Sequence, residues 1–178
     1  MSDLKDLSVL LTRPEHQIEE LRQLIQKAGG NPVCFSVTKI IPMDGNHLLE
    51  PFFRDNIPKT DLAVFVSPNA VTFGIELLKK HALALPSDCK ILAVGPGTAK
   101  LIERNSIKVH DYPKAEFNSE ALLALPSLDQ IEGKHVLIVR GLGGREKIAR
   151  ELLTRKAIVC QLPCYERLPS KDLDTSVL

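Results

Sequence analysis

The run Leu62-Ala-Val-Phe-Val-Ser-Pro-Asn69 passes from five consecutive apolar residues directly into a helix start. The apolar part predicts a buried strand at 62–66, because a strand covered on both faces needs no polar alternation. Ser67 is a favoured helix N-cap, and Pro68 suits the first helical turn. Apolar residues then recur at helical spacing over 71–78. This stretch therefore predicts a strand followed by an amphipathic helix, which is half of a βαβ unit.

The same alternation recurs along the rest of the chain. Further strands are predicted at 91–94, 107–110, 135–140 and 157–162, and helices at about 98–103, 118–125 and 144–152. Strands that alternate with helices form right-handed βαβ units. We therefore predict an α/β fold in which 61–162 forms a doubly wound, five-stranded parallel sheet with helices on both faces. The irregular stretch 43–60 is predicted to be a connection with one helical turn.

The N-terminal part predicts a separate βα unit. Ser8–Leu11 is typical of a buried strand, Thr12–Glu15 has a capping-box pattern, and Gly29-Gly30 ends the helix that follows. Residues 33–41 form one long extended run, and 172–178 resembles the first turns of another helix. An isolated βα unit cannot bury its strand on both faces, so we expect it to leave an apolar patch exposed. That patch would contain Val9, Leu10, Ile18, Leu21 and Ile25.

Composition and charge exclude several classes of protein. The chain has 178 residues, 44% of them hydrophobic and 25% charged, which is ordinary for a globular protein. A formal net charge of +1 and few aromatic residues argue against a nucleic-acid partner. No apolar run reaches the length of a membrane span, and the N-terminus has no secretory signal, so we expect a cytoplasmic protein. The four cysteines lack zinc-site spacing, so we expect no metal site and packed, reduced thiols.

Strand ends that lead directly into helix starts are candidate anion sites. In a parallel sheet these turns lie at the carboxyl ends of the strands, where open α/β folds bind ligands. Each helix start offers unpaired N–H groups and partial positive charge. We therefore predict an anionic ligand, although plain helix capping explains any one turn taken alone. The candidate binding residues are Thr12, Arg13, Ser67, Pro68, Asn69, Gly97, Thr98, Gly141, Gly143, Gly144 and Arg145.

Other chemistry has weaker support in the sequence. The 141–146 stretch departs from the dinucleotide fingerprint, because Glu146 stands where a small residue is needed, and no phosphate-loop pattern occurs. The histidines are scattered, and neither a nucleophile elbow nor a zinc-protease motif is present. Tyr165 stands out in an extended connector between Cys164 and Glu166. Two hypotheses remain for it, packing at an interface or a phenol that faces a cleft.

Taken together, these motifs resemble uroporphyrinogen-III synthase. The resemblance runs in order from about residue 8 to 168. It rests on Val9-Leu-Leu-Thr-Arg-Pro14, Phe65-Val-Ser-Pro-Asn-Ala-Val71, Ala93-Val-Gly-Pro-Gly-Thr-Ala99, Asn118-Ser-Glu-Ala-Leu-Leu123, Val136-Leu-Ile-Val-Arg-Gly-Leu-Gly-Gly-Arg-Glu146 and Tyr165-Glu-Arg167.

The resemblance implies two similar α/β domains joined by a two-stranded connector. On this basis 1–32 starts a first domain that is left incomplete here, and 33–60 is the connector. Residues 61–162 form the complete second domain, and 163–178 returns toward the first. The resemblance implies that a family chain continues past residue 178, so this chain resembles a truncated one. Where the family commonly has glycine after the residue at 155, this sequence has Lys156, and we expect mild strain or an earlier helix end there.

The resemblance also implies an activity. The family is a cofactor-free lyase of heme biosynthesis that cyclises hydroxymethylbilane, a linear tetrapyrrole polycarboxylate, to uroporphyrinogen III, with loss of water and inversion of ring D. It implies a monomer at full length, with no nucleic-acid or membrane partner. Tyr165 becomes the candidate that hydrogen-bonds or protonates the leaving hydroxyl, and the strand-end residues would hold carboxylates. The alternative is a non-catalytic sensor domain that binds a small anion.

Overall fold

The structure, a computed structural model, has a mixed α/β fold and describes residues 4–46, 50–144 and 146–170. The chain divides into two compact units, each of which is described by itself. Unit 1 comprises Met1–Ile41 and Arg167–Leu178, and unit 2 comprises Pro42–Glu166. The helix expected over 172–178 lies outside the described residues. Within the described part of the chain, no helix has the length and apolar character needed to cross a membrane.

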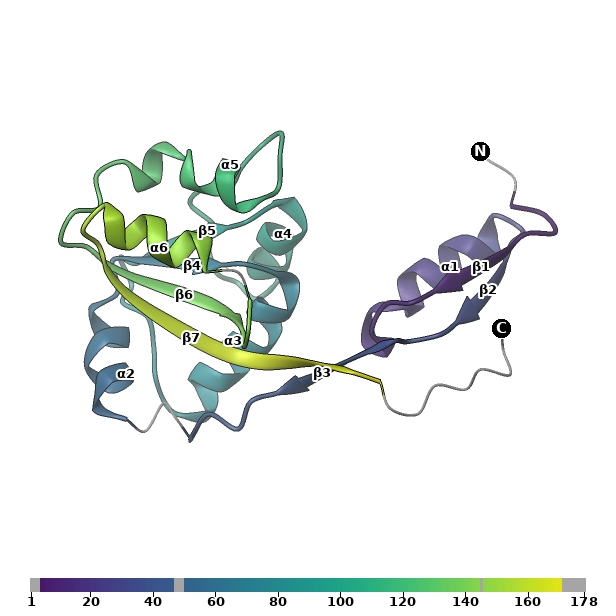
Figure 1. Ribbon diagram of the computed structural model, residues 1–178, viewed down its shortest axis with the longest axis horizontal. Coiled ribbons are helices and arrows are strands. Elements are labelled where there is room, and N and C mark those ends of the chain that lie inside the picture. The colour runs from purple at the N-terminus through teal and green to yellow at the C-terminus, as the bar shows by residue number, and fades with distance from the viewer. Residues whose placement is uncertain (1–3, 47–49, 145, 171–178) are drawn as a thin grey trace. The chain divides into compact units, whose positions relative to one another are not determined.

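The larger sheet has five strands, four of which run parallel (Figure 1). Its spatial order is β3 (Thr38–Pro42), β7 (Ile158–Pro169), β6 (His135–Gly141), β4 (Leu62–Phe65) and β5 (Lys90–Ala93). The edge strand β3 runs antiparallel to β7, since Met43 donates to Cys164 and Ser170 donates to Val37 through backbone hydrogen bonds. The four predicted strands that are present run parallel as expected, but the fifth strand of the sheet is antiparallel and lies outside the predicted segment 61–162.

The strand predicted at 107–110 is also absent. This segment meets β5 through an isolated bridge between Leu92 and Asp111, supported by a hydrogen bond from His110 N–H to the carbonyl of Ile91. Pro113 follows two residues later and has no N–H to continue a ladder. The fifth strand is instead β3, which comes from the predicted connector.

Two of the described helices begin at cap residues that the sequence indicates. Ser67 Oγ accepts a hydrogen bond from Ala70 N–H and so caps α3 (Pro68–Lys80). Asn118 caps α5 (Ser119–Leu123) in the same way through Ala121 N–H. The other α-helices described in unit 2 are α2 (Pro51–Asn56), α4 (Pro96–Arg104) and α6 (Lys147–Thr154). The helical turn expected within 43–60 is therefore present as α2.

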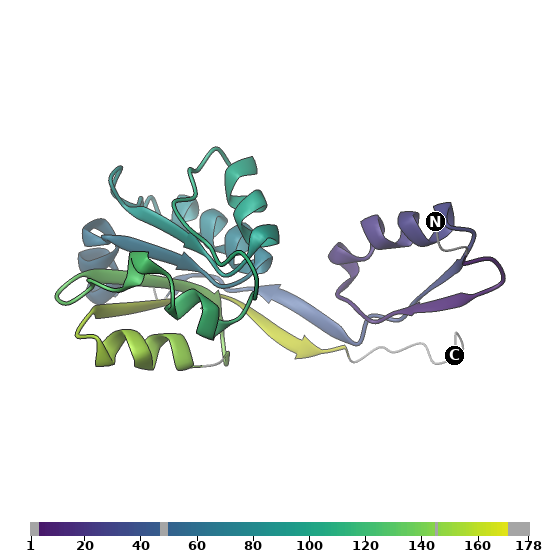
Figure 2. The ribbon, with the colours of Figure 1, turned by 90° about the horizontal axis from the view of Figure 1, so that it is seen from above.

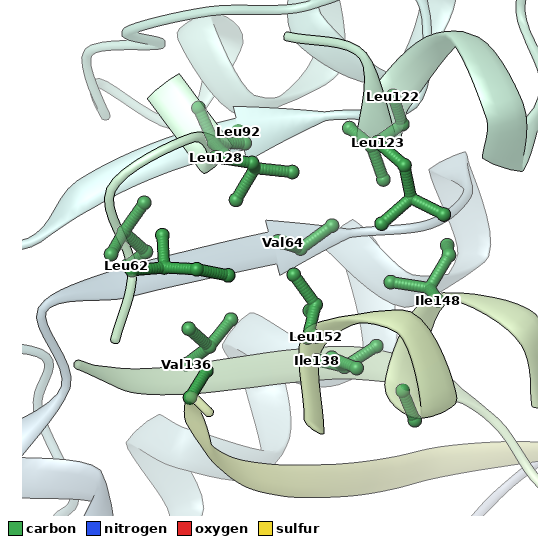
Figure 3. Packing of buried hydrophobic residues seen from close by; sticks show 13 residues of the cluster. Leu62, Val64, Leu92, Leu122, Leu123, Leu128, Val136, Ile138, Ile148 and Leu152 are labelled. Carbon is green, nitrogen blue, oxygen red and sulfur yellow. The ribbon is translucent and has the colours of Figure 1, made fainter. Parts of the chain in front are cut away.

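Helices cover both faces of the larger sheet (Figure 2). One face buries Val64, Leu92 and Ile138 against side chains from α5 and α6, such as Leu122 and Leu152 (Figure 3). On the other face α3 lies so close that a side-chain carbon at Gly74 would come within 2.4 Å of Val139. Burial of both faces is the reason that these strands are continuously apolar.

Unit 1 contains a small parallel sheet of two strands, β1 (Ser8–Leu11) and β2 (Asn31–Cys34), with α1 (Glu19–Lys27) between them in the chain. The long run expected at 33–41 is therefore two strands, β2 and the separate β3. The N-terminal βα unit is therefore not isolated, because β2 pairs with β1. Helix α1 has no side-chain cap, and a 3₁₀ turn at Glu15–Gln17 precedes it, so the predicted capping box is wrong.

The apolar patch expected in unit 1 is largely covered. Ile18 and Ile25 are each only 5% exposed and pack with Leu11, because α1 folds over the β1–β2 pair. Val9 and Leu21 are half-buried and pack against this cluster, and of the five expected residues only Leu10 is exposed, at 45%. The prediction of an exposed patch is wrong for four of its five residues.

Candidate functional site

The strand order creates a topological switch point in unit 2. Chain connections from β4 lead through α3 to β5 on one side, whereas β6 lies on the other side of β4 and leads through α6 to β7. Helices α3 and α6 cover opposite faces of the sheet (Figure 2). The connections that follow β4 and β6 therefore lead away from each other. Open α/β sheets bind ligands between two such neighbouring strands, just outside their carboxyl ends. Ser67 follows β4 and Gly141 ends β6, so both lie at this switch point.

Tyr165 also lies at the switch point. Its hydroxyl is 3.1 Å from Ser67 Oγ, and the residue is only 6% exposed. The ring lies against the backbone of Gly141, where a side-chain carbon would come within 2.6 Å of ring atoms. Phe73 of α3 supports the ring, with centroids 5.9 Å apart. The phenol is thus fixed on several sides by residues of unit 2.

A register shift in the β6–β7 ladder explains how Tyr165 reaches this position. Arg140 pairs with Pro163, but the next residue, Gly141, pairs with Tyr165. Such bulges re-aim side chains at the ends of strands. Because of the shift, the consecutive residues Cys164 and Tyr165 are both buried. Burial raises the pKa of the Cys164 thiol to about 12, so this neighbour of the phenol remains uncharged at neutral pH.

A polar network supports the loop that follows β6. The Arg140 guanidinium is only 8% exposed; it donates to the Glu146 carboxylate at 2.7 Å and also to Gln161 and the Gly141 carbonyl. Gln161 in turn donates to the second oxygen of Glu146 at 3.1 Å. The hydrogen bonds from Gln161 and Arg140 lower the pKa of Glu146. The network links both ends of the 141–146 loop to β7.

The other predicted site residues are distributed as follows. Pro68 and Asn69 form the first turn of α3 beside Ser67, with Pro68 exposed and Asn69 buried. Gly97 is exposed in the first turn of α4, with open space at its α-carbon, whereas Thr98 is only 3% exposed.

Gly143 and Gly144 are exposed on the loop after β6, and Gly143 has the left-handed φ of +71° that favours glycine. Thr12 and Arg13 are exposed after β1 in unit 1, and Arg145 lies outside the described residues.

Sequence reasoning did not find the Arg140 network. Its available signal was an arginine at the end of an otherwise apolar strand, Val136–Val139. Ionisable side chains are almost never buried without a partner. The partners Glu146 and Gln161 could not be named in advance, because they depend on how the loop and β7 fold back.

Comparisons with known proteins identify the family. A family model described as uroporphyrinogen-III synthase HemD matches residues 19–177. The uroporphyrinogen-III synthase of Proteus mirabilis is 34% identical over 162 residues, which are 91% of this chain and 81% of that protein. The chain belongs to the uroporphyrinogen-III synthase family.

Other members of the family cover the same region. The uroporphyrinogen-III synthase of Escherichia coli (strain K12) is 34% identical over 164 residues, 90% of this chain and 65% of its own length. A crystal structure of a mutant uroporphyrinogen III synthase from the extremely thermophilic bacterium Thermus thermophilus superposes with a TM-score of 0.67 at 22% identity. It covers 92% of this chain and 64% of that one, and at this identity it supports the fold alone. The chain thus spans slightly less than two thirds of several synthases that it matches. Nothing in the comparisons supports the sensor alternative, since these relatives carry the name of an enzyme.

Proposed function

We propose that the protein acts in the cyclisation of hydroxymethylbilane to uroporphyrinogen III, with loss of water and inversion of ring D. The observation that carries this proposal is the buried Tyr165 phenol at the switch point, hydrogen-bonded to Ser67 Oγ at 3.1 Å. Family membership supplies the reaction, and this geometry supplies a hydroxyl donor at the place where such sheets bind ligands.

The hydrogen-bonding of Ser67 gives the phenol a defined role. Ser67 Oγ already accepts the N–H of Ala70, so its own proton is available to the oxygen of Tyr165. In that arrangement the proton of Tyr165 remains free for the hydroxyl that leaves the substrate. As the carbon–oxygen bond breaks, the hydroxyl departs as water with this proton, and Ser67 stabilises the phenolate. The electron-rich pyrroles carry the resulting cation on the substrate.

Binding of the substrate carboxylates is assigned to backbone N–H groups at helix starts and on the loop. The first turns of α3 and α4 and the Gly143–Gly144 amides offer such donors beside parallel strand ends. Because the Thr98 side chain is buried, we assign the contact there to its backbone N–H and to Gly97. Thr98→Ala should then change KM only slightly. Thr12, Arg13 and Arg145 remain candidate carboxylate ligands.

The wider organisation is proposed on the same basis. Unit 1 is proposed to be part of one α/β domain and unit 2 to be the other, doubly wound one, with β3 (Thr38–Pro42) and the 162–168 part of β7 as the connecting strands. A cytoplasmic location, a monomeric state and the absence of a nucleic-acid partner stay predictions from composition and resemblance.

The test is the isomer formed from hydroxymethylbilane. Ring closure without inversion gives the isomer in which ring D keeps its orientation, so chromatography of the two isomers separates catalysed from uncatalysed closure. We expect the chain to raise the fraction of uroporphyrinogen III above that of a protein-free control, and Tyr165→Ala to reduce this effect. An isomer ratio equal to that of the control would contradict the proposed activity for this chain.

A further inference from the structure

A hollow of unit 2 lies between α3, strand β5 and the segment 107–110. Its volume is about 300 Å³, at the lower end of the range for small-molecule sites. Phe65 and Ile91 line it from the sheet, and Ile75 and Leu78 line it from α3. None of the residues that line this hollow belongs to the site around Tyr165, so the two are separate.

The inner wall of the hollow is apolar. Phe65, Ile75, Leu78 and Ile91 are each less than 9% exposed and present only carbon atoms from their side chains. Cys89 also lines it, and burial raises the pKa of this thiol to about 12, so it carries no charge at neutral pH. An alkyl chain placed here would exchange water for apolar contact, which is favourable in proportion to the area covered.

The mouth of the hollow carries positive charge. Lys79 and Lys108 line it and are exposed, as is His110. The Nδ1 atom of His110 accepts a hydrogen bond from Ile91 N–H at 2.9 Å, so the neutral ring carries its proton on Nε2 and can donate it. The lining contains no carboxylate, and the adjacent Asp88 is outside it.

We propose that this hollow binds a free, medium-chain monocarboxylate, with its apolar tail against α3 and β5 and its carboxylate between Lys79, Lys108 and His110. An apolar interior of limited volume with a cationic rim matches one negative charge on a short hydrocarbon chain. The site is independent of the proposed cyclisation, so neither stands or falls with the other.

Octanoate is the probe. The control ligand is 1-octanol, which has a chain of the same length but no negative charge. Titration of the ¹⁵N-labelled chain followed by amide chemical shifts should give saturable changes at Ile91, Ile107 and His110. We expect octanol to bind at least tenfold more weakly. The double variant Lys79→Ala, Lys108→Ala should weaken octanoate at least tenfold and leave octanol unchanged. The control Lys100→Ala removes an exposed lysine of α4 that does not line the hollow, and it should change neither affinity.

Several results would overturn the proposal. Equal affinities for octanoate and octanol would show that the charged rim plays no part. Shifts confined to residues outside the hollow, no saturable shift at millimolar octanoate, or full octanoate affinity in the double variant would each exclude a carboxylate site here. Because the lysines are exposed, the double variant is expected to fold, and the dispersion of its own amide spectrum verifies this directly.

Discussion

The side-chain oxygens of Ser67 and Tyr165 lie 3.1 Å apart, although 98 residues separate them in the chain. This contact joins the N-cap of α3 to strand β7 across the carboxyl ends of β4 and β6. It places a phenol beside the positive end of a helix, where a developing negative charge on its oxygen is stabilised.

Removing the Tyr165 hydroxyl tests its proposed role. Tyr165→Phe should lower kcat about tenfold, equivalent to ~1.4 kcal/mol of transition-state stabilisation, and leave KM nearly unchanged. The physical reason is that the phenol acts mainly on the departing hydroxyl. Steady-state cyclisation kinetics provide the measurement, and Tyr165→Ala, which also removes the packed ring, should be worse. A kcat near that of the unaltered protein for the Phe variant would assign Tyr165 to packing alone.

A side chain at Gly141 should displace the phenol ring. In Gly141→Ala the added carbon would come within 2.6 Å of Tyr165 ring atoms, so ring or strand must shift. We expect a loss of about 1–3 kcal/mol in the free energy of unfolding, as for other overpacked sites, together with lower kcat. The control is Gly97→Ala, whose added carbon meets nothing within 4 Å. Equal unfolding midpoints for the two variants in a denaturant titration would refute the steric argument.

Lys156 is strained at the end of α6. It adopts a left-handed conformation with φ of +62°, which agrees with the mild strain expected at this position from the family resemblance. Lys156→Gly should raise the free energy of unfolding by about 1 kcal/mol, because glycine takes this conformation without a steric penalty. The ion pair of Lys156 with Glu132 is exposed at both ends, so its loss should matter little. Lys156→Ala is the control, since it removes the same ion pair, keeps the strain and should not stabilise.

Removing Arg140 from its network should destabilise the protein more than removing the charge of Glu146. Arg140→Ala removes a buried guanidinium from three partners and should lower the free energy of unfolding by about 2–4 kcal/mol. Glu146→Gln should cost less than about 1 kcal/mol, since Glu146 is 47% exposed and Arg140 keeps Gln161 and the Gly141 carbonyl. Chemical denaturation of both variants gives the comparison. Losses of similar size would mean that the ion pair dominates the network.

Acid should weaken unit 2 through Asp61. Asp61 Oδ2 accepts the N–H of His135 at 2.8 Å, and this hydrogen bond, with Lys134, lowers the pKa of Asp61 in the folded state. The stabilisation is therefore complete above the unfolded pKa of about 3.9 and is lost as the pH falls through the lower folded value. Free energies of unfolding measured from pH 7 to pH 2 should fall less steeply for Asp61→Asn. A parallel pH dependence in both proteins would exclude Asp61 as a contributor.

Much of unit 2 follows from short segments of the chain. Ser67 and Asn118 cap their helices through hydrogen bonds that span three residues, so the residue types alone indicate where α3 and α5 begin. Strand β4 and the 136–139 part of β6 are continuously apolar because both their faces are covered, and this pattern is visible without any partner. The strain at Lys156 was expected from the family resemblance, not from the local residues alone.

The pairing of segments that are distant in the chain could not be predicted from local residues. Residues 31–34 and 38–42 are both extended, yet β2 pairs with β1 in unit 1 and β3 lies antiparallel against β7. Likewise Ser67 and Tyr165 can each be named as candidates from sequence, but their contact depends on a register shift in the β6–β7 ladder. Helix caps and hydrophobic periodicity depend on residues a few positions apart, so they can be predicted from the sequence. Strand order, register and the burial of Arg140 depend instead on which segments, distant in the chain, pack together and bury their apolar surfaces. The tertiary structure alone determines which segments these are.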